Sequence, residues 1–279
     1  MKKTIVALIY DFDKTLCDRD MQEYAFIPNL GLESEEFWHE VDEFAINNRM
    51  DKILACMYMM VHKSEKKGTP LKRETCINLG QYIKFYPGIT EWFSRINEYG
   101  KENNIEIEHY IISSGLKEII EGTSIAKHFK KIYACEFMYR DGQAVWPKLA
   151  VNYTNKTQFV YRINKGVLDI SNNVALNSSQ PDSEKRVFFS NMIYIGDGLT
   201  DVPCMKLVKQ SGGHSIALYN PGKHRNAAQL LEQDRVDWMF EADYTEGSDL
   251  DSAMKTLLQN LASYNQLQGL KEQQKRDFH

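Results

Sequence analysis

The stretch ALIYDFDKTLCD, residues 7–18, joins an apolar run to two carboxylates, Asp11 and Asp13, that are separated by a single residue. The apolar, β-branched run Thr4–Tyr10 predicts a buried strand of a parallel sheet. Aspartate also favours ordinary strand-to-loop turns, so the pair alone leaves a structural and a chemical interpretation open. The later motifs of the chain bear on that choice.

Further apolar runs alternate with helical patterns along the chain. Strands are predicted at residues 108–112, 192–195 and 215–219, with a weaker fifth at 236–240, and helices at 89–103, 116–120, 156–164 and 249–266. Ser248 is a candidate N-cap of the last helix. This alternation predicts an α/β fold with a Rossmann-like parallel sheet. Asp141-Gly142 predicts a hairpin turn, the polar segment 172–191 a surface excursion, and the charged tail 271–279 a frayed end.

The segment directly after the first strand departs from the alternation. From about residue 18 to 85 only helical periodicity is found. We therefore expect a small all-helical cap domain at 17–85, and an α/β core domain at 1–16 and 86–279. An insert at this position lies above the carboxyl ends of the strands, where open α/β sheets bind ligands.

Composition excludes several classes of protein. A formal net charge of -4 gives no electrostatic case for nucleic acid or an anionic membrane. No apolar stretch approaches the roughly 18 residues of a spanning helix, and the start MKKTIVALIY lacks the features of a cleavable signal. Five scattered cysteines without a C-x-x-C pair fit a reducing cytoplasm. No feature of the sequence indicates a protein partner.

Three predicted strands end in chemically reactive groups, and these ends converge in a doubly wound sheet. The first strand, Thr4–Tyr10, is followed by Asp11 and Asp13. The third strand, 192–195, is followed by Asp197 and Asp201 in the stretch IYIGDGLTD. Two carboxylates ~4 Å apart repel by about 4 kcal/mol at an effective dielectric near 20, so four of them require a counter-charge. An all-oxygen ligand set suits a hard ion such as Mg²⁺.

The strand between them predicts an anion site. Ser113, Ser114 and Gly115 of IISSG precede the helical pattern LKEII, so free backbone N–H groups are expected to favour a phosphate. A lysine is expected to balance that dianion. Lys156 begins a predicted helix and Lys165 ends it, which favours Lys156 while Lys165 stays the competitor.

These motifs resemble those of the haloacid dehalogenase-like superfamily of phosphatases. DFDKTL is similar to its D-x-D-x-T motif, IISSG to its Ser/Thr motif, Lys156 to its lysine motif, and GDGLTD to its acidic metal motif, in the family order from Tyr10 to Asp201. The helical insert between the first two motifs is similar to that of the phosphoserine phosphatase-like branch.

The resemblance implies a role for each matched residue. Asp11 is the expected nucleophile, which forms an aspartyl-phosphate, and Asp13 the acid and base. Ser113, Ser114 and Gly115 are expected to bind the phosphoryl group together with Lys156. The expected ligands of Mg²⁺ are Asp197, the Asp11 carboxylate and the main-chain carbonyl of Asp13, with Asp201 either a direct ligand or a residue that orients one.

The predicted function is thus a Mg²⁺-dependent phosphatase of a small phosphorylated metabolite. A phosphotransferase or pyrophosphate-cleaving enzyme, and a non-catalytic phospho-binding domain, remain alternatives. Relatives place a substrate-sensing Glu shortly after the first motif, where this chain holds Asp20 with Glu23 nearby, and Arg49 is a candidate carboxylate reader or a solvated helical residue. Apolar residues of the insert predict either a substrate wall or internal packing: Met57, Met59, Met60, Tyr24, Phe26 and Trp38.

Overall fold

The computed structural model describes residues 4–278 and contains a seven-stranded sheet in the order β4-β3-β2-β1-β5-β6-β7. Neighbouring strands are parallel except for the antiparallel pair β3–β4, which confirms the predicted α/β class. The first three residues of the expected core, and the last residue of the expected frayed tail, lie outside the described residues. The strands are β1 (Thr4–Tyr10), β2 (Ile105–Leu116), β3 (Phe129–Arg140), β4 (Gln143–Leu149), β5 (Met192–Gly196), β6 (His214–Tyr219) and β7 (Trp238–Glu241).

Strand β1 is central because its side chains are apolar on both faces. Val6 to Tyr10 are fully buried, as expected for a parallel strand covered on both sides. β1 pairs with β2 on one edge and with β5 on the other, so that Tyr10 lies opposite both Ile111 and Ile195. The carboxyl ends of these three strands therefore lie side by side.

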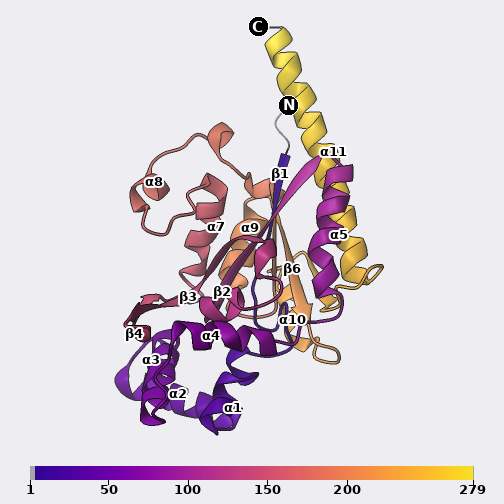
Figure 1. Cartoon of the computed structure of the whole chain (residues 1–279). Helices are drawn as coiled ribbons and strands as arrows, with labels where there is room; N and C mark the ends of the chain where they lie inside the picture. The colour runs from indigo at the N-terminus through magenta and orange to yellow at the C-terminus, as the bar shows by residue number, and fades with distance from the viewer. Residues whose placement is uncertain (1–3, 279) are drawn as a thin grey trace.

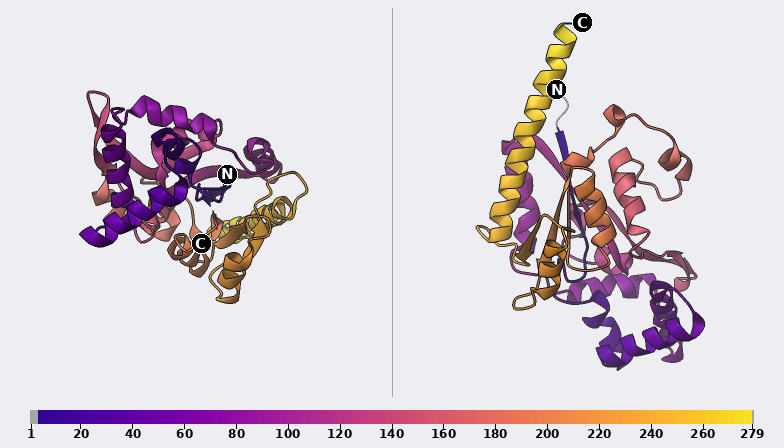
Figure 2. Two further views of the ribbon diagram at one scale, coloured as in Figure 1. Left: turned by 90° about the horizontal axis from the view of Figure 1, so that it is seen from below. Right: turned by 180° about the vertical axis from the view of Figure 1, so that it is seen from behind.

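Helices cover both faces of the sheet (Figure 1). α5 and α11 lie on one face and α7 and α9 on the other, an arrangement that the rear view repeats (Figure 2). The helices of this α/β part are α5 (Ile89–Glu102), α6 (Lys117–Glu121), α7 (Lys156–Lys165), α8 (Asn173–Asn177), α9 (Val202–Gln210), α10 (Arg225–Glu232) and α11 (Asp249–Asp277).

The segment between β1 and α5 is helical, with no strand of the sheet within it. Its helices lie together at the end of the sheet opposite the two chain ends (Figure 1). The tip of the β3–β4 hairpin contacts them, since the Ala144 N–H donates to the Leu71 carbonyl at 2.8 Å. The four α-helices are α1 (Phe26–Leu30), α2 (Ser34–Asn48), α3 (Lys52–Lys66) and α4 (Arg73–Leu79).

Several local predictions are tested directly. Asp141 and Gly142 have φ of 52° and 77°, as a tight hairpin turn requires, and Ser248 caps α11 by accepting from the Asp251 N–H. The expected frayed tail was wrong, because α11 continues to Asp277: its Lys, Glu, Gln and Arg residues are good helix formers, and extending a helix needs no new nucleus. Within residues 4–278, no helix combines the length and apolar character that a membrane crossing requires.

Candidate active site

Three strand ends bring the candidate residues together. Asp11 follows the last residue of β1, and its N–H donates to the Ile195 carbonyl of β5 at 2.9 Å. Asp197 follows β5 directly, and Asp201 is the N-cap residue of α9. The parallel pairing of β1 with β5 thus places carboxylates that are far apart in sequence at one edge of the sheet.

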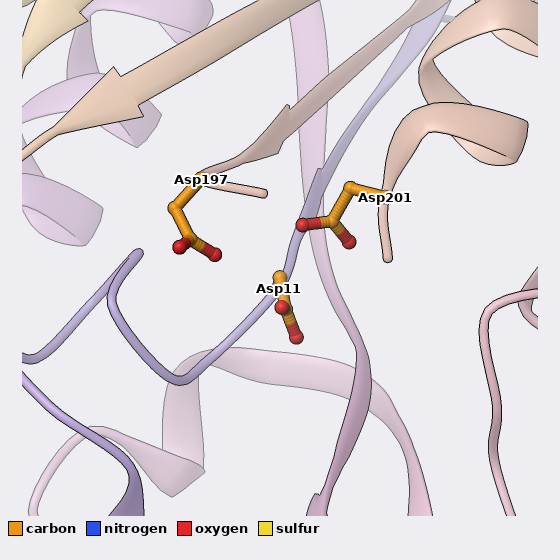
Figure 3. A group of neighbouring side chains, drawn as sticks. All are labelled: Asp11, Asp197 and Asp201. Carbon is orange, nitrogen blue, oxygen red and sulfur yellow. The ribbon is translucent and has the colours of Figure 1, made fainter. Parts of the chain in front are cut away.

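Asp11, Asp197 and Asp201 point toward one another (Figure 3). Each offers one carboxylate oxygen, and these three oxygens all lie within 4.8 Å of one another. Oxygen ligands at such spacing suit a hard divalent cation. Three of the four predicted metal ligands, Asp11, Asp197 and Asp201, form this cluster of carboxylates. The predicted ligand atom of Asp13, the fourth, is its main-chain carbonyl, and that assignment stays a prediction.

Lys156 supplies one positive charge to this cluster. Its Nζ lies 3.2 Å from Asp11 Oδ1 and 2.8 Å from Asp201 Oδ1, and the side chain is fully buried. The Tyr194 hydroxyl donates to the same Asp201 oxygen at 2.8 Å. The competing Lys165, at the other end of α7, instead donates to the carbonyls of Leu176 and Ser178 at 2.6 and 2.7 Å.

The charges of this cluster do not balance without a cation. Burial, and then the neighbouring Asp201, raise the pKa of Asp11 to about 7, although Lys156 opposes the shift. Burial, and then the neighbouring Asp201 and Asp11, raise the pKa of Asp197 well above its usual value. Burial lowers the pKa of Lys156, but Asp11 and Asp201 outweigh that effect and raise it. Three carboxylates against one ammonium leave two negative charges, and a divalent ion fits this donor set.

Asp13 lies apart from these three and faces the same cavity. Its Oδ1 accepts from the Met21 N–H at 2.8 Å, and burial, Asp20 and Asp11 together raise its pKa well above the usual value. The residue opposite is Gly115, where a Cβ would lie 2.9 Å from Asp13 Oδ2 and 2.0 Å from Met21 Cε. Only glycine lets the strand approach the carboxyl this closely.

Ser113, Ser114 and Gly115 line the cavity from β2. As predicted, they come shortly before a helix, because α6 begins at Lys117. β3 pairs with Ile112 and then with Leu116, and the register shift between these two pairings falls on the three residues. The expectation that their N–H groups bind an anion stays a prediction. The Gly115 N–H donates a hydrogen bond to Ser113 Oγ at 2.9 Å. The Ser113 hydroxyl thus accepts one hydrogen bond and keeps its own hydrogen for a further acceptor.

The site opens into a cavity of about 620 Å³ between the strand ends and the inserted helices. Of the three candidates in the insert, Asp20 lines it and forms an ion pair with Lys14 at 2.8 Å. Glu23 and Arg49 are not among the residues that line it. Glu23 accepts from the Trp38 indole N–H at 2.9 Å, and Arg49 is the exposed left-handed C-cap of α2.

The apolar residues of the insert divide between the two predicted roles. Trp38, Met57 and Met60 line the cavity, whereas Met59, Tyr24 and Phe26 are not among its lining residues. Sequence reasoning missed two other lining residues, Ile53 and Cys56, although their spacing could have indicated them. With Met57 and Met60 they repeat at i, i+3, i+4 and i+7 on α3, and so all four share one helix face.

Comparison with known proteins identifies the pattern. The sequence profile of the haloacid dehalogenase-like hydrolases matches residues 8–206. An uncharacterized protein of Borreliella burgdorferi is 29% identical over 277 residues, covering 89% of this chain and 95% of its own length.

Solved structures share the fold. A HAD family hydrolase from Salmonella enterica serovar Typhi matches with a TM-score of 0.56 and 16% identity, over 86% of this chain and 68% of that one. A probable phosphoserine phosphatase from Vibrio cholerae gives 0.57 and 12%, over 94% and 67%. A phosphoserine phosphatase in a phospho-aspartyl intermediate analogue state gives 0.54 and 15%, over 91% and 99%.

Proposed function

Because this chain belongs to the haloacid dehalogenase-like hydrolases, we propose that it is a Mg²⁺-dependent phosphatase of small phosphomonoesters that acts through an aspartyl-phosphate. The observation that carries the proposal is the meeting of Asp11, Asp13, Ser113 and Asp197 around one cavity, with Lys156 buried against Asp11. Nucleophile, proton donor, phosphate ligand and cation ligand are all present in that group.

In the proposed first step, a carboxylate oxygen of Asp11 attacks phosphorus. The phosphorus–oxygen bond to the organic group breaks, and Asp13 gives its proton to the departing oxygen. The raised pKa of Asp13 supports this role, because burial and the neighbouring carboxylates Asp20 and Asp11 favour the protonated form that can donate. The product of the step is an aspartyl-phosphate at position 11 and a free alcohol.

In the second step, water attacks the phosphorus of that intermediate while Asp13 takes up the water proton. The bond between phosphorus and the Asp11 oxygen breaks, which frees inorganic phosphate and restores both carboxyl groups. Ser113 and Lys156 offset charge on the phosphoryl oxygens and on Asp11. Bound Mg²⁺ would be held by the carboxylates of Asp11, Asp197 and Asp201 together with the main-chain carbonyl of Asp13, and would neutralise phosphoryl charge.

We further propose that residues 17–85 act as a cap domain over a core of residues 1–16 and 86–279. The cavity supports this division, because its walls come from the strand ends and from the inserted helices. A small phosphorylated metabolite bound in this cavity is the proposed partner. The proposal includes a cytoplasmic location, supported by the five cysteines, all of them free and buried in the described chain.

The test is phosphate release from a panel of phosphometabolites and from p-nitrophenyl phosphate, with Mg²⁺ or with EDTA. Asp11→Asn is expected to lower turnover at least ~1000-fold, because no nucleophile remains. Asp182→Asn, an exposed change outside the cavity, is the matched control and keeps activity. Release that survives in Asp11→Asn would contradict the mechanism. Transfer of phosphate to an added alcohol instead of water would indicate a phosphotransferase.

A further inference from the structure

The part of the cavity wall that α3 contributes is apolar, whereas the buried Gln22, which also lines the cavity, is polar. Ile53, Cys56, Met57 and Met60 line the cavity from a single face of α3, and Trp38 of α2 joins them. Cys56, Met57 and Met60 are buried, and Ile53 and Trp38 are half-buried. The polar groups of the proposed catalytic site thus lie across the cavity from the aliphatic and aromatic side chains of α3 and Trp38.

The same character continues in residues that are open to solvent. Met50, Tyr153 and Leu199 line this cavity and are 38%, 56% and 75% exposed, respectively. They come from three separate parts of the chain: the turn before α3, the loop before α7 and the loop after β5. Exposed apolar groups gathered around one hollow indicate a ligand surface.

The charged lining residues outside the catalytic cluster already have partners. Lys14 pairs with Asp20 at 2.8 Å, and Lys52 pairs with Asp42 at 2.5 Å. Asp51 accepts from the backbone N–H groups that begin α3, and its second oxygen accepts from the Asn152 amide at 3.1 Å. In the part of the chain that the structure describes, both lining lysines are thus paired with a carboxylate, and both oxygens of Asp51 accept hydrogen bonds.

The volume of the cavity indicates the size of the organic group that the substrate can carry. A cavity of about 620 Å³ lies within the range of roughly 300–1,000 Å³ that holds drug-sized ligands. A phosphoryl group beside Asp11 and Ser113 fills a small part of this space. The remainder lies against the apolar wall.

We infer that the substrate is a phosphomonoester whose organic group is uncharged and largely apolar, an alkyl or aromatic alcohol, bound against Trp38 and the Ile53 face of α3. This inference rests on the proposed phosphatase function and concerns only the organic half of the substrate. It distinguishes this enzyme from one that reads a charged amino acid.

The first test uses straight-chain alkyl phosphates from ethyl to hexyl, whose leaving alcohols are nearly equal in reactivity. If each added methylene is buried, kcat/KM rises about fourfold per carbon until the wall is covered. Phosphoserine is expected to fall below butyl phosphate. A flat or falling series, or phosphoserine as the best substrate, would overturn the inference.

The second test compares the same substitution at neighbouring residues of α3. Ile53→Gln introduces a polar group into the wall, whereas Leu54→Gln lies outside the cavity lining, at a residue that is 37% exposed. Ile53→Gln is expected to lower kcat/KM about tenfold for hexyl phosphate and by a clearly smaller factor for ethyl phosphate, whose chain covers less of the wall. Leu54→Gln leaves both unchanged. Equal effects of the two variants on both substrates would refute the assigned wall.

A third variant addresses the exposed ion pair between Lys52 and Asp42, which a ligand can break at low cost. If Lys52 reads a charged substrate, Lys52→Met selectively abolishes phosphoserine hydrolysis, and the inference is wrong. If no ester in the series releases phosphate with Mg²⁺ present, the proposed function fails and the inference fails with it. Release from ethyl phosphate without dependence on chain length removes the inference alone.

Discussion

Replacing Lys156 by methionine removes the ammonium that lies between two buried carboxylates. Its Nζ is 3.2 Å from Asp11 Oδ1 and 2.8 Å from Asp201 Oδ1. At an effective dielectric near 20 these separations correspond to attractions of about 5 and about 6 kcal/mol. Desolvation of the ammonium offsets much of this sum, and loss of one partner from a buried pair costs about 3–5 kcal/mol. We expect Lys156→Met to lower the free energy of unfolding by that amount at pH 8.

Lys165→Met is the matched control, because it makes the same change at the other end of α7. Lys165 Nζ donates to two backbone carbonyls that are near solvent, and their loss costs about 1–2 kcal/mol. The two variants also separate the two lysines in function. Only Lys156→Met is expected to lower kcat of phosphate release, by about 100- to 1000-fold.

The assay is urea unfolding in EDTA at pH 8 and pH 5, with kcat measured separately in Mg²⁺. Burial already raises the pKa of Asp11 to about 7, and loss of the ammonium raises it further. The folded variant therefore binds protons that the unfolded chain does not, and its stability relative to the wild type recovers as the pH falls from 8 to 5. Equal losses in both variants, or a Lys156→Met loss that is the same at both pH values, would refute this reasoning.

Three further outcomes are expected. Mg²⁺ should raise the melting temperature of the wild type but not of Asp197→Asn, as measured by calorimetry, since binding to the folded state stabilises it. Burial lowers the pKa of His109 to about 3, so the neutral histidine contributes stability above pH 6.5 that is lost as the pH falls. Between pH 7.5 and 4.5, the free energy of unfolding of the wild type should therefore fall by about 3 kcal/mol relative to that of His109→Gln, as measured by urea titrations. Gly115→Ala places a Cβ 2.0 Å from Met21 Cε and 2.9 Å from Asp13 Oδ2, and should lower kcat at least ~10-fold in the phosphatase assay, with partial recovery in Gly115→Ala/Met21→Ala.

Sequence reasoning placed the residues at the strand ends well because their signals are local. The apolar run Thr4–Tyr10 has the same bounds as β1, since Asp11 ends the buried segment abruptly. Lys156 was preferred to Lys165 because a lysine at the start of α7 lies at the sheet end where the site forms, and the structure places its Nζ beside Asp11.

The cap side was less predictable because its geometry depends on how short helices pack. Arg49 was a candidate for the site, but it ends α2 in a left-handed conformation, exposed to solvent. Ser113 and Ser114 lie where the register between β2 and β3 shifts, because β3 pairs with Ile112 and then again with Leu116. Such pairing is a tertiary effect that overrides local propensity, and no single stretch of sequence records it.

The central place of β1 has a consequence for how the chain folds. Its neighbour β5 begins at Met192. One edge of β1 therefore stays unpaired until about two thirds of the chain has been synthesised. Parallel pairings this distant in sequence form slowly and leave strand edges open to other chains. The proposed phosphatase activity would need Asp197 beside Asp11, so we expect it to be the last property recovered on refolding, well after helix formation.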